Sequence, residues 1–327
     1  MSHPTPMNEL PLISVVIPAY NAEAFIDEAL ESIFAQDYPS FEVIVVNDGS
    51  TDATAQRVAA HCDKVRYFEQ ANSGGFPGSP RNLGLYHSRG EFICFLDADD
   101  IMLPGRLRLQ ADFLRGHPAV GMLFGDYQNF SASGPIGEPH FRTCLRLQER
   151  LGGSPSVVLP PSDATTLLLR ENVGIPSSMM MRREALEAAP GFSTEFRVGE
   201  DFHFYYRILR RFSLGVVDRV VSWRRIHDNN ITGDSIRMLH NIVASRSALY
   251  ESEQSEANRA VLRETIHDCD ISLGRAYANQ RDFGRSVAHS LRAMQGSFPR
   301  RLPWIAVGLR GLVRTAAIAM NLKRPSS

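Results

Sequence analysis

The stretch LISVVIPAYNAEAFIDEALESIFAQDYPSFEVIVVNDGS, residues 12–50, alternates a strand pattern with a helix pattern. Its first apolar run, residues 12–17, is rich in β-branched residues and stops at Pro18, which is typical of a short buried strand. Residues 21–36 then repeat apolar side chains at helical spacing. Residues 41–54 repeat the scheme with a strand, a Gly turn and a helix start. This order predicts a layered α/β domain with a largely parallel sheet.

The alternation continues well past this stretch. Further strands are predicted at residues 64–70, 91–96 and 119–130. A loop rich in Gly and Pro, residues 71–80, precedes a predicted helix around residues 81–88. In such sheets ligands bind beyond the carboxyl ends of the strands, so polar residues at those ends are the first candidates for a site.

The second half of the chain is less regular. Residues 131–161 contain many Gly, Pro and Ser and are predicted to be rich in loops. Residues 175–192 are predicted to form a strand, a helix and a turn, and residues 199–212 an amphipathic helix. From about residue 235 the pattern favours helices alone. Residues 274–295 resemble one helical hairpin of a tetratricopeptide unit, although a single unit makes no repeat array.

Composition excludes several classes of protein. Hydrophobic residues make up 43% of the 327 positions and charged residues 22%, as in ordinary globular proteins. The net charge of -1 gives no indication of nucleic-acid binding. The four cysteines have no zinc-like spacing and are expected to be reduced thiols. The N-terminus lacks the apolar segment of a signal peptide, so we expect a cytoplasmic protein.

Three carboxylates follow the predicted strand 91–96: Asp97, Asp99 and Asp100. If the segment is extended, Asp97 and Asp99 point to the same side and Asp100 to the other. Two like charges so close favour a divalent cation that also binds phosphate. The alternative is that they are turn and capping residues, for which Asp is well suited. Their place at a strand end favours the cation, and Asp100 is expected to be a turn or capping residue.

Two other strand ends carry complementary side chains. Tyr20 offers a flat ring for stacking, and Asp48 can accept hydrogen bonds from a base or a ribose. A half-buried surface tyrosine and an Asx-turn before Gly49 are the alternatives. Arg81 follows the glycine-rich loop at the start of a helix, where backbone N–H groups and an arginine could bind an anion. A structural arginine that packs across the sheet is a fair competitor.

The second half adds weaker signals. Glu200 and Asp201 lie in the first turn of the predicted helix 199–212, where the helix dipole favours acidic residues without any catalytic role. Asp201 gains weight because a transfer reaction needs a base and the first half offers no obvious spare one. His227 is either a loop histidine or a ligand of metal or phosphate.

Taken together, these motifs resemble the family 2 glycosyltransferases, which have the GT-A fold. The resemblance covers roughly residues 12–232 and implies a Rossmann-like mixed central sheet flanked by helices, with a C-terminal helical extension. The loop NSGGFPGSPRN is longer and richer in Pro than the family's usual loop. The Q-x-x-R-W signature of processive synthases is absent, which favours transfer of one sugar. The motifs that carry the resemblance are VVIPAYNAEAFIDEALESIFAQDYPSFEVIVVNDGSTDAT, RNLGLYHSRGEFICFLDADDIMLPGRL and GFSTEFRVGEDFHFYYRILRRF.

The resemblance also implies residue roles. Asp201 matches the catalytic base of an inverting displacement, and Glu200 lies on the acceptor side. Asp99 and His227 match positions at a Mn²⁺ or Mg²⁺ ion on the donor's diphosphate. Arg81 would contact the diphosphate or order the site. The residues implied to bind the nucleotide sugar are Pro18, Ala19, Tyr20, Asn21, Asp48, Arg81, Asp97 and Ala98.

We therefore expect an inverting hexosyltransferase that uses a nucleotide-diphosphate sugar, foremost a UDP-sugar, and a glycan or lipid-linked acceptor in cell-surface glycan or glycolipid synthesis. The expected catalytic domain is 1–234, with a nucleotide-sugar half (12–130) and an acceptor half (131–234), followed by a helical region, 235–327. A non-catalytic nucleotide-sugar-binding relative and a sugar-phosphate nucleotidylyltransferase are the alternatives. The second would need a glycine-rich pyrophosphate loop where this chain reads PAYNAEAF.

The C-terminal segment, residues 296–327, carries six basic and no acidic residues, interleaved with apolar ones and Trp304. Such a helix can lie in a membrane interface, which would place the protein peripherally on the inner membrane face. Packing on the catalytic domain or in a homodimer contact is the equally weighted alternative.

Overall fold

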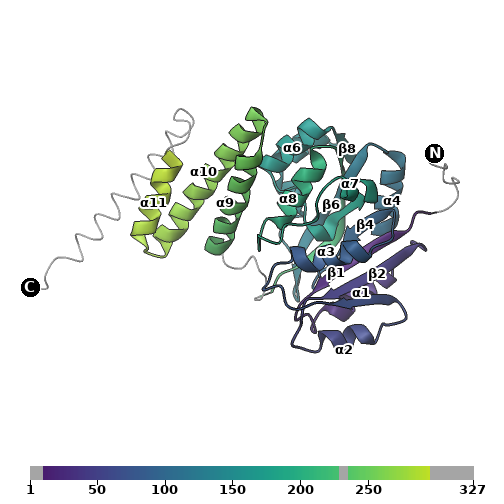
Figure 1. Ribbon diagram of the computed structural model, residues 1–327. Coiled ribbons are helices and arrows are strands. Elements are labelled where there is room, and N and C mark those ends of the chain that lie inside the picture. The colour runs from purple at the N-terminus through teal and green to yellow at the C-terminus, as the bar shows by residue number, and fades with distance from the viewer. Residues whose placement is uncertain (1–9, 228–234, 295–327) are drawn as a thin grey trace, which may run out of the picture. The chain divides into compact units, whose positions relative to one another are not determined.

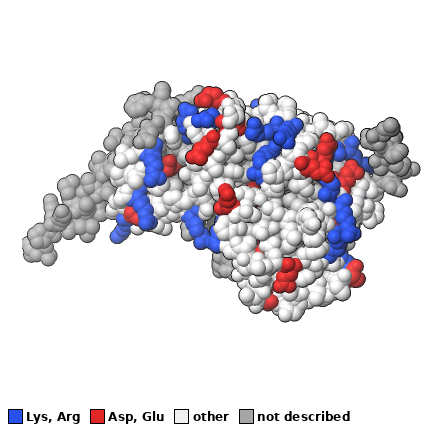
Figure 2. Space-filling model, viewed as in Figure 1, with Lys and Arg blue, Asp and Glu red and all other residues white. Residues whose placement is uncertain are grey.

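The computed structural model describes residues 10–227 and 235–294. The chain divides into two compact units, residues 1–228 and 229–327, and each is described by itself. The basic segment 296–327 lies outside the described residues. Acidic and basic side chains lie next to one another on the face shown in Figure 2, in keeping with the small net charge.

The first unit is built on a ten-stranded sheet in the order β3-β2-β1-β4-β9-β6-β10-β5, with β7 beside β6 and β8 beside β10. Strands β1, β2, β4, β6 and β8 of this sheet are labelled in Figure 1. Strand β1 is parallel to β2 and β4, but β9 is antiparallel to both β4 and β6. The sheet is therefore mixed rather than largely parallel, because β9 enters between the two halves. The strands are β1 (Ile13–Ala19), β2 (Phe41–Asn47), β3 (Val65–Glu69), β4 (Phe92–Phe95), β5 (Ile101–Met102), β6 (Val120–Ser131), β7 (Gly134–Ile136), β8 (Ser156–Leu159), β9 (Met179–Arg182) and β10 (Ser213–Arg225).

Helices flank this sheet on both faces, as the packing of β1 illustrates. Ile13, Val15 and Ile17 share a buried core with α1 and α4. Val16 points to the opposite face, where Gly84 of α3 lies so close that a Cβ there would be 2.3 Å from the Val16 Cγ1 atom. Burial on both faces explains why β1 is a continuous apolar run. The helices are α1 (Ile26–Phe34), α2 (Thr54–Ala59), α3 (Gly78–His87), α4 (Arg106–Gly116), α5 (Leu145–Leu151), α6 (Pro161–Arg170), α7 (Arg183–Glu187) and α8 (Glu200–Leu209).

Residues 131–161 contain more structure than the sequence predicts. Strands β7 and β8 and helix α5 occupy much of this region, and Leu147, Leu151 and Leu159 are buried. These elements are only three to seven residues long, too short for an apolar period to stand out from the surrounding Gly, Pro and Ser.

The described part of the second unit, residues 235–294, is helical. Helix α9 (Ser235–Ser252) packs against α10 (Glu256–Asn279), and α10 packs against α11 (Phe283–Met294). The predicted hairpin at 274–295 corresponds to the end of α10 and all of α11. Among residues 10–227 and 235–294, no helix has the length and apolar character needed to cross a membrane.

Candidate active site

The predicted site residues of the first half lie where parallel strands end. Strands β1, β2 and β4 run side by side in the same direction, so the segments after them share one edge of the sheet. Pro18 and Ala19 close β1, and Tyr20 follows with half of its surface (50%) exposed. Ala98, after β4, is buried. The sheet therefore brings these segments together as the sequence predicts, and leaves the Tyr20 ring accessible for stacking.

Asn21 fixes the shape of this edge. Its backbone lies in the left-handed region, with φ of 48°, which Asn tolerates better than most residues. The Asn21 side-chain oxygen accepts a hydrogen bond from the Thr51 backbone N–H at 2.8 Å, and the Asn21 N–H donates to the Ser50 hydroxyl at 2.9 Å. Asn21 therefore ties the segment after β1 to the segment after β2.

Asp48 holds the glycine-rich loop. It is only 4% exposed, and its carboxylate accepts hydrogen bonds from the Ser73 hydroxyl (2.6 Å), the Ser73 N–H (3.0 Å) and the Gln70 side chain (2.6 Å). Gly49 allows this close approach, since its φ is +67° and a Cβ there would be 2.7 Å from the Asn72 nitrogen. Both carboxylate oxygens of Asp48 thus have partners within the protein, which the sequence pattern did not reveal.

The acidic segment after β4 is a turn and not extended. The Asp100 N–H donates to the Asp97 carbonyl at 3.0 Å, which closes the turn. The prediction that an extended backbone aligns Asp97 with Asp99 is therefore wrong. The Asp97 carboxylate binds Arg81, whereas the Asp99 carboxylate lies beside His227. An extended backbone could not form this hydrogen bond between the first and fourth residues of the segment, which is characteristic of a β-turn.

Arg81 joins the two halves of the sequence. Its guanidinium donates to the Asp97 carboxylate at 2.8 Å and to the Glu200 carboxylate at 2.6 Å, although Glu200 lies 119 positions further along the chain. Arg81 is 5% exposed and Glu200 is 4% exposed. The Arg81 guanidinium therefore fixes the start of α8 against the acidic turn. This is the structural role that the sequence left open as the alternative to an anion site.

Burial perturbs the two carboxyl groups at the start of α8. Loss of solvent and the neighbouring Asp201 carboxylate raise the pKa of Glu200 to about 8, against the opposing effect of Arg81. Burial likewise raises the pKa of Asp201, and the Arg81 charge opposes it. The Asp201 side chain accepts a hydrogen bond from the Phe202 N–H at 2.7 Å. A carboxylate with a raised pKa is better matched to proton abstraction near neutral pH than an ordinary aspartate.

Asp99 and His227 form a second pair at this edge. The His227 Nε2 atom lies 2.9 Å from the Asp99 Oδ2 atom. Burial and the nearby Asp97 carboxylate raise the pKa of Asp99. Within residues 10–227 and 235–294 no three His, Cys, Asp or Glu side chains come together in a way that could hold a metal. A cation bound by Asp99 and His227 would therefore take phosphate and water as further ligands, since Mg²⁺ usually keeps several waters and binds substrate phosphates.

Two residues of the site were missed or underrated from the sequence. Asp100 is 2% exposed, and its carboxylate accepts a hydrogen bond from the Arg225 N–H at 2.9 Å, so it is a buried anchor as well as a turn residue. The Arg225 side chain donates to the Asp99 carbonyl at 2.8 Å. The sequence offered one signal for this contact, namely the basic pair Arg224 and Arg225 shortly before His227.

Replacing Arg81 by methionine should destabilise the first unit by about 3–5 kcal/mol, because it leaves buried carboxylates without their counter-charge. Chemical denaturation at pH 9, above the pKa of about 8 for Glu200, measures the effect, since both carboxyl groups then carry a charge. Arg115→Met is the matched control, since Arg115 pairs with Asp112 at 3.4 Å on the exposed side of α4 and such pairs contribute about 0–1 kcal/mol. Equal stability of the two variants would show that the Arg81 contacts carry no such weight.

The raised pKa of Glu200 predicts a pH dependence of stability. Between about 4.5 and about 8 the folded protein retains a proton that the unfolded chain has released. The Glu200 contribution to the free energy of unfolding therefore falls as the pH rises through this window. Unfolding of wild type and Glu200→Gln, compared at pH 5 and pH 8.5, should show the variant gaining stability relative to wild type at the higher pH. A constant difference would contradict the assignment.

Comparison with solved structures identifies the fold first. The solved structure of residues 1–349 of Staphylococcus aureus TarS with UDP-GlcNAc has a TM-score of 0.65 over 86% of this chain and 80% of that fragment, at 21% identity. A mannosyltransferase of Pyrobaculum calidifontis, solved with GDP-Man and Mn²⁺, has a TM-score of 0.60 over 96% of this chain and 81% of its own, also at 21% identity. These likenesses confirm the GT-A fold predicted from the motifs.

The sequence pattern of the family described as Glycosyl transferase family 2 matches residues 14–189, and the chain belongs to this family. An uncharacterized glycosyltransferase of Rickettsia bellii is 29% identical over 235 residues, which are 67% of this chain and 29% of the relative. TarS is 43% identical over 109 residues, 32% of this chain and 19% of TarS. The chain spans about a third of the length of the rickettsial relatives it matches. The glycosyltransferase class predicted from the motifs is thereby confirmed.

Proposed function

We propose that this protein transfers one sugar from a nucleotide-diphosphate sugar to an acceptor hydroxyl, with inversion, and that residues 1–228 are its catalytic unit. The observation that supports this most is the Arg81 ion network, which joins the acidic turn after β4 to the first turn of α8. The network holds Asp97, a candidate for the donor site, to Glu200, the neighbour of the proposed base Asp201. Family membership supports the reaction class, and the network supports the choice of residues.

Asp201 is the general base of the proposed reaction. As the acceptor oxygen forms its bond to the anomeric carbon, the bond from that carbon to the diphosphate oxygen breaks on the opposite side. The acceptor proton moves to the Asp201 carboxylate, and the electron pair leaves with the nucleotide diphosphate. The pKa of Asp201, raised by burial, suits a base at neutral pH. Glu200, the proposed acceptor-side residue, is held by its ion pair with Arg81 at 2.6 Å.

Asp99 and His227 would hold the divalent cation, Mn²⁺ or Mg²⁺. The oxygen and nitrogen donors 2.9 Å apart suit such an ion, provided that the diphosphate and water complete its coordination. When bound, the cation supplies positive charge to the leaving diphosphate. The mannosyltransferase solved with GDP-Man and Mn²⁺ supports the choice of ion.

A UDP-sugar is the proposed donor, because TarS was solved with UDP-GlcNAc and is 43% identical to this chain over 109 residues, the higher of the two identities given above for sequence relatives. Tyr20 would stack on the base at the end of β1. Asp48 would contribute to nucleotide binding indirectly, because its carboxylate holds the glycine-rich loop through Ser73. The name of TarS, a poly(ribitol-phosphate) β-N-acetylglucosaminyltransferase, supports a cell-surface glycan or a lipid-linked glycan as the acceptor.

Incubation with Mn²⁺ and a panel of nucleotide sugars, with nucleotide diphosphate release as the measured quantity, tests the proposal. One or two donors should be turned over, and chelation by EDTA should abolish the release. Binding of nucleotide sugars without any release, with acceptor glycans present, would instead favour a non-catalytic binding relative.

A further inference from the structure

Arg225, the last residue of β10, lies between two aromatic rings. Its guanidinium carbon is 4.9 Å from the centre of the Phe25 ring and 4.4 Å from the centre of the Phe130 ring. One guanidinium nitrogen binds the Glu28 carboxylate at 2.5 Å. An arginine held by two rings and an anion keeps a single orientation, because each contact restricts its rotation.

Arg225 forms hydrogen bonds with the acidic turn after β4. Its side-chain Nε–H donates to the Asp99 carbonyl at 2.8 Å, and its backbone N–H donates to the Asp100 carboxylate at 2.9 Å. Two successive residues of the turn are therefore fixed from β10. Because the first of them is Asp99, this contact also fixes the backbone from which the Asp99 carboxylate extends.

Phe25 extends the same arrangement to the other metal-binding candidate. Its ring stacks on the His227 imidazole, with ring centres 4.9 Å apart and an angle of 29° between the planes. The Nε2 atom of the same imidazole lies 2.9 Å from Asp99 Oδ2. Phe25 precedes α1 and Arg225 ends β10, so contacts from two parts of the fold converge on Asp99 and His227.

We propose that Phe25 and Arg225 are positioning residues for a divalent cation bound by Asp99 and His227. Phe25 fixes the plane of the imidazole, and Arg225 fixes the backbone of the acidic turn, so that both donor atoms are in place before the ion arrives. Residues that orient metal ligands in this way typically account for 10–100-fold in metal affinity. The inference rests on the proposed function, since it presupposes that Asp99 and His227 bind the cation.

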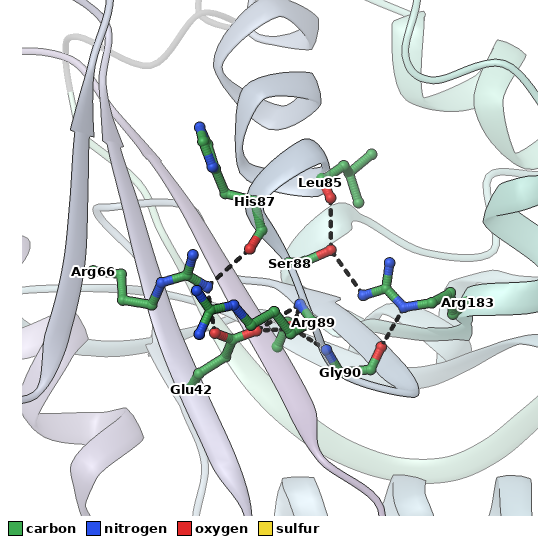
Figure 3. Close-up of polar contacts among 9 residues, drawn as sticks. Glu42, Arg66, Leu85, His87, Ser88, Arg89, Gly90 and Arg183 are labelled. Atoms are coloured by element: carbon green, nitrogen blue, oxygen red, sulfur yellow. Dashed lines mark hydrogen bonds and ion pairs between the residues drawn. The ribbon is translucent and has the colours of Figure 1, made fainter.

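The fold contains a second arrangement of the same kind that serves as a matched control. The Phe68 ring stacks on His87, with ring centres 3.7 Å apart, and the Arg66 guanidinium lies over Phe68 at 5.6 Å. Arg66 donates to the His87 carbonyl at 2.8 Å and binds the Glu42 carboxylate (Figure 3). This group is built from the same residue types, but from β2, β3 and the end of α3.

The test is Mn²⁺ binding to the full chain, measured by electron paramagnetic resonance with and without UDP. Phe25→Leu and Arg225→Gln should weaken Mn²⁺ binding by about 10–100-fold. Phe68→Leu and Arg66→Gln should leave it unchanged. If Arg225→Gln lowers the melting temperature, its Mn²⁺ affinity could reflect a loss of stability. Phe25→Leu then tests the positioning roles by itself, because the Phe25 side chain makes no hydrogen bond.

The outcomes separate the two proposals. Wild-type Mn²⁺ affinity in Phe25→Leu, in a protein that binds Mn²⁺, would overturn the positioning roles and leave the proposed function intact. Equal losses in Phe25→Leu and Phe68→Leu would also overturn them, because the effect would then be general. No Mn²⁺ binding by the wild-type chain, even with UDP, would overturn the assignment of the cation to Asp99 and His227 and with it the inference.

Discussion

Asp201→Asn should abolish sugar transfer while the protein still binds its donor. The amide has nearly the shape of the carboxylate and can still accept the hydrogen bond from the Phe202 N–H, but it cannot take a proton from the acceptor. General-base catalysis contributes on the order of 10²–10⁴-fold, so kcat should fall by at least about 100-fold. Nucleotide diphosphate release measures kcat, and calorimetric titration with the donor measures binding.

Asp112→Asn is the matched control for this variant. Asp112 is an exposed carboxylate on α4 whose partner, Arg115, lies at 3.4 Å, so its loss should leave both quantities unchanged. Wild-type kcat in Asp201→Asn would remove Asp201 from the role of base. Loss of donor binding together with kcat would mean that Asp201 acts in binding.

Asp99→Ala should act one step earlier, on binding itself. It removes one of the two side chains that face each other across 2.9 Å, and leaves His227 without its carboxylate neighbour. Since loss of a residue that merely orients a ligand costs about 10–100-fold in metal affinity, loss of a ligand should cost about 100-fold or more. Mn²⁺ binding and donor binding should fall together, because the diphosphate shares the ion.

Asp112→Ala again provides the control at an exposed position. Donor binding that is insensitive both to Asp99→Ala and to EDTA would contradict a metal-dependent donor site. A variant that binds Mn²⁺ normally but loses the donor would place Asp99 at the nucleotide and not at the ion.

The sequence was informative wherever local pattern and position decide the outcome. The strand–helix–strand order of residues 12–50 is found as β1, α1 and β2, because burial on both faces of β1 leaves its signature in adjacent residues. Parallel pairing of β1 with β2 and β4 then brings the ends of these strands to one edge. Tyr20, Asp48 and the acidic turn could be placed together on this ground alone.

Contacts between distant residues could not be predicted in the same way. Nothing in the local pattern around Arg81 indicates that it bridges Asp97 and Glu200, since one partner is 119 positions away. The turn at Asp97–Asp100 likewise depends on Arg225, which reaches it from β10. First-turn acidic residues are common for electrostatic reasons, and only the buried arginine distinguishes Glu200 from that background.

The stereochemistry of the product tests the central claim most directly. A UDP-sugar with an α-linked sugar is incubated with the protein, Mn²⁺ and the acceptor found by screening, and ¹H NMR reports the configuration at the anomeric carbon. A single displacement assisted by Asp201 predicts a β-linked product, and no product with Asp201→Asn. An α-linked product would contradict the account, because retention requires a mechanism other than the single displacement proposed for Asp201.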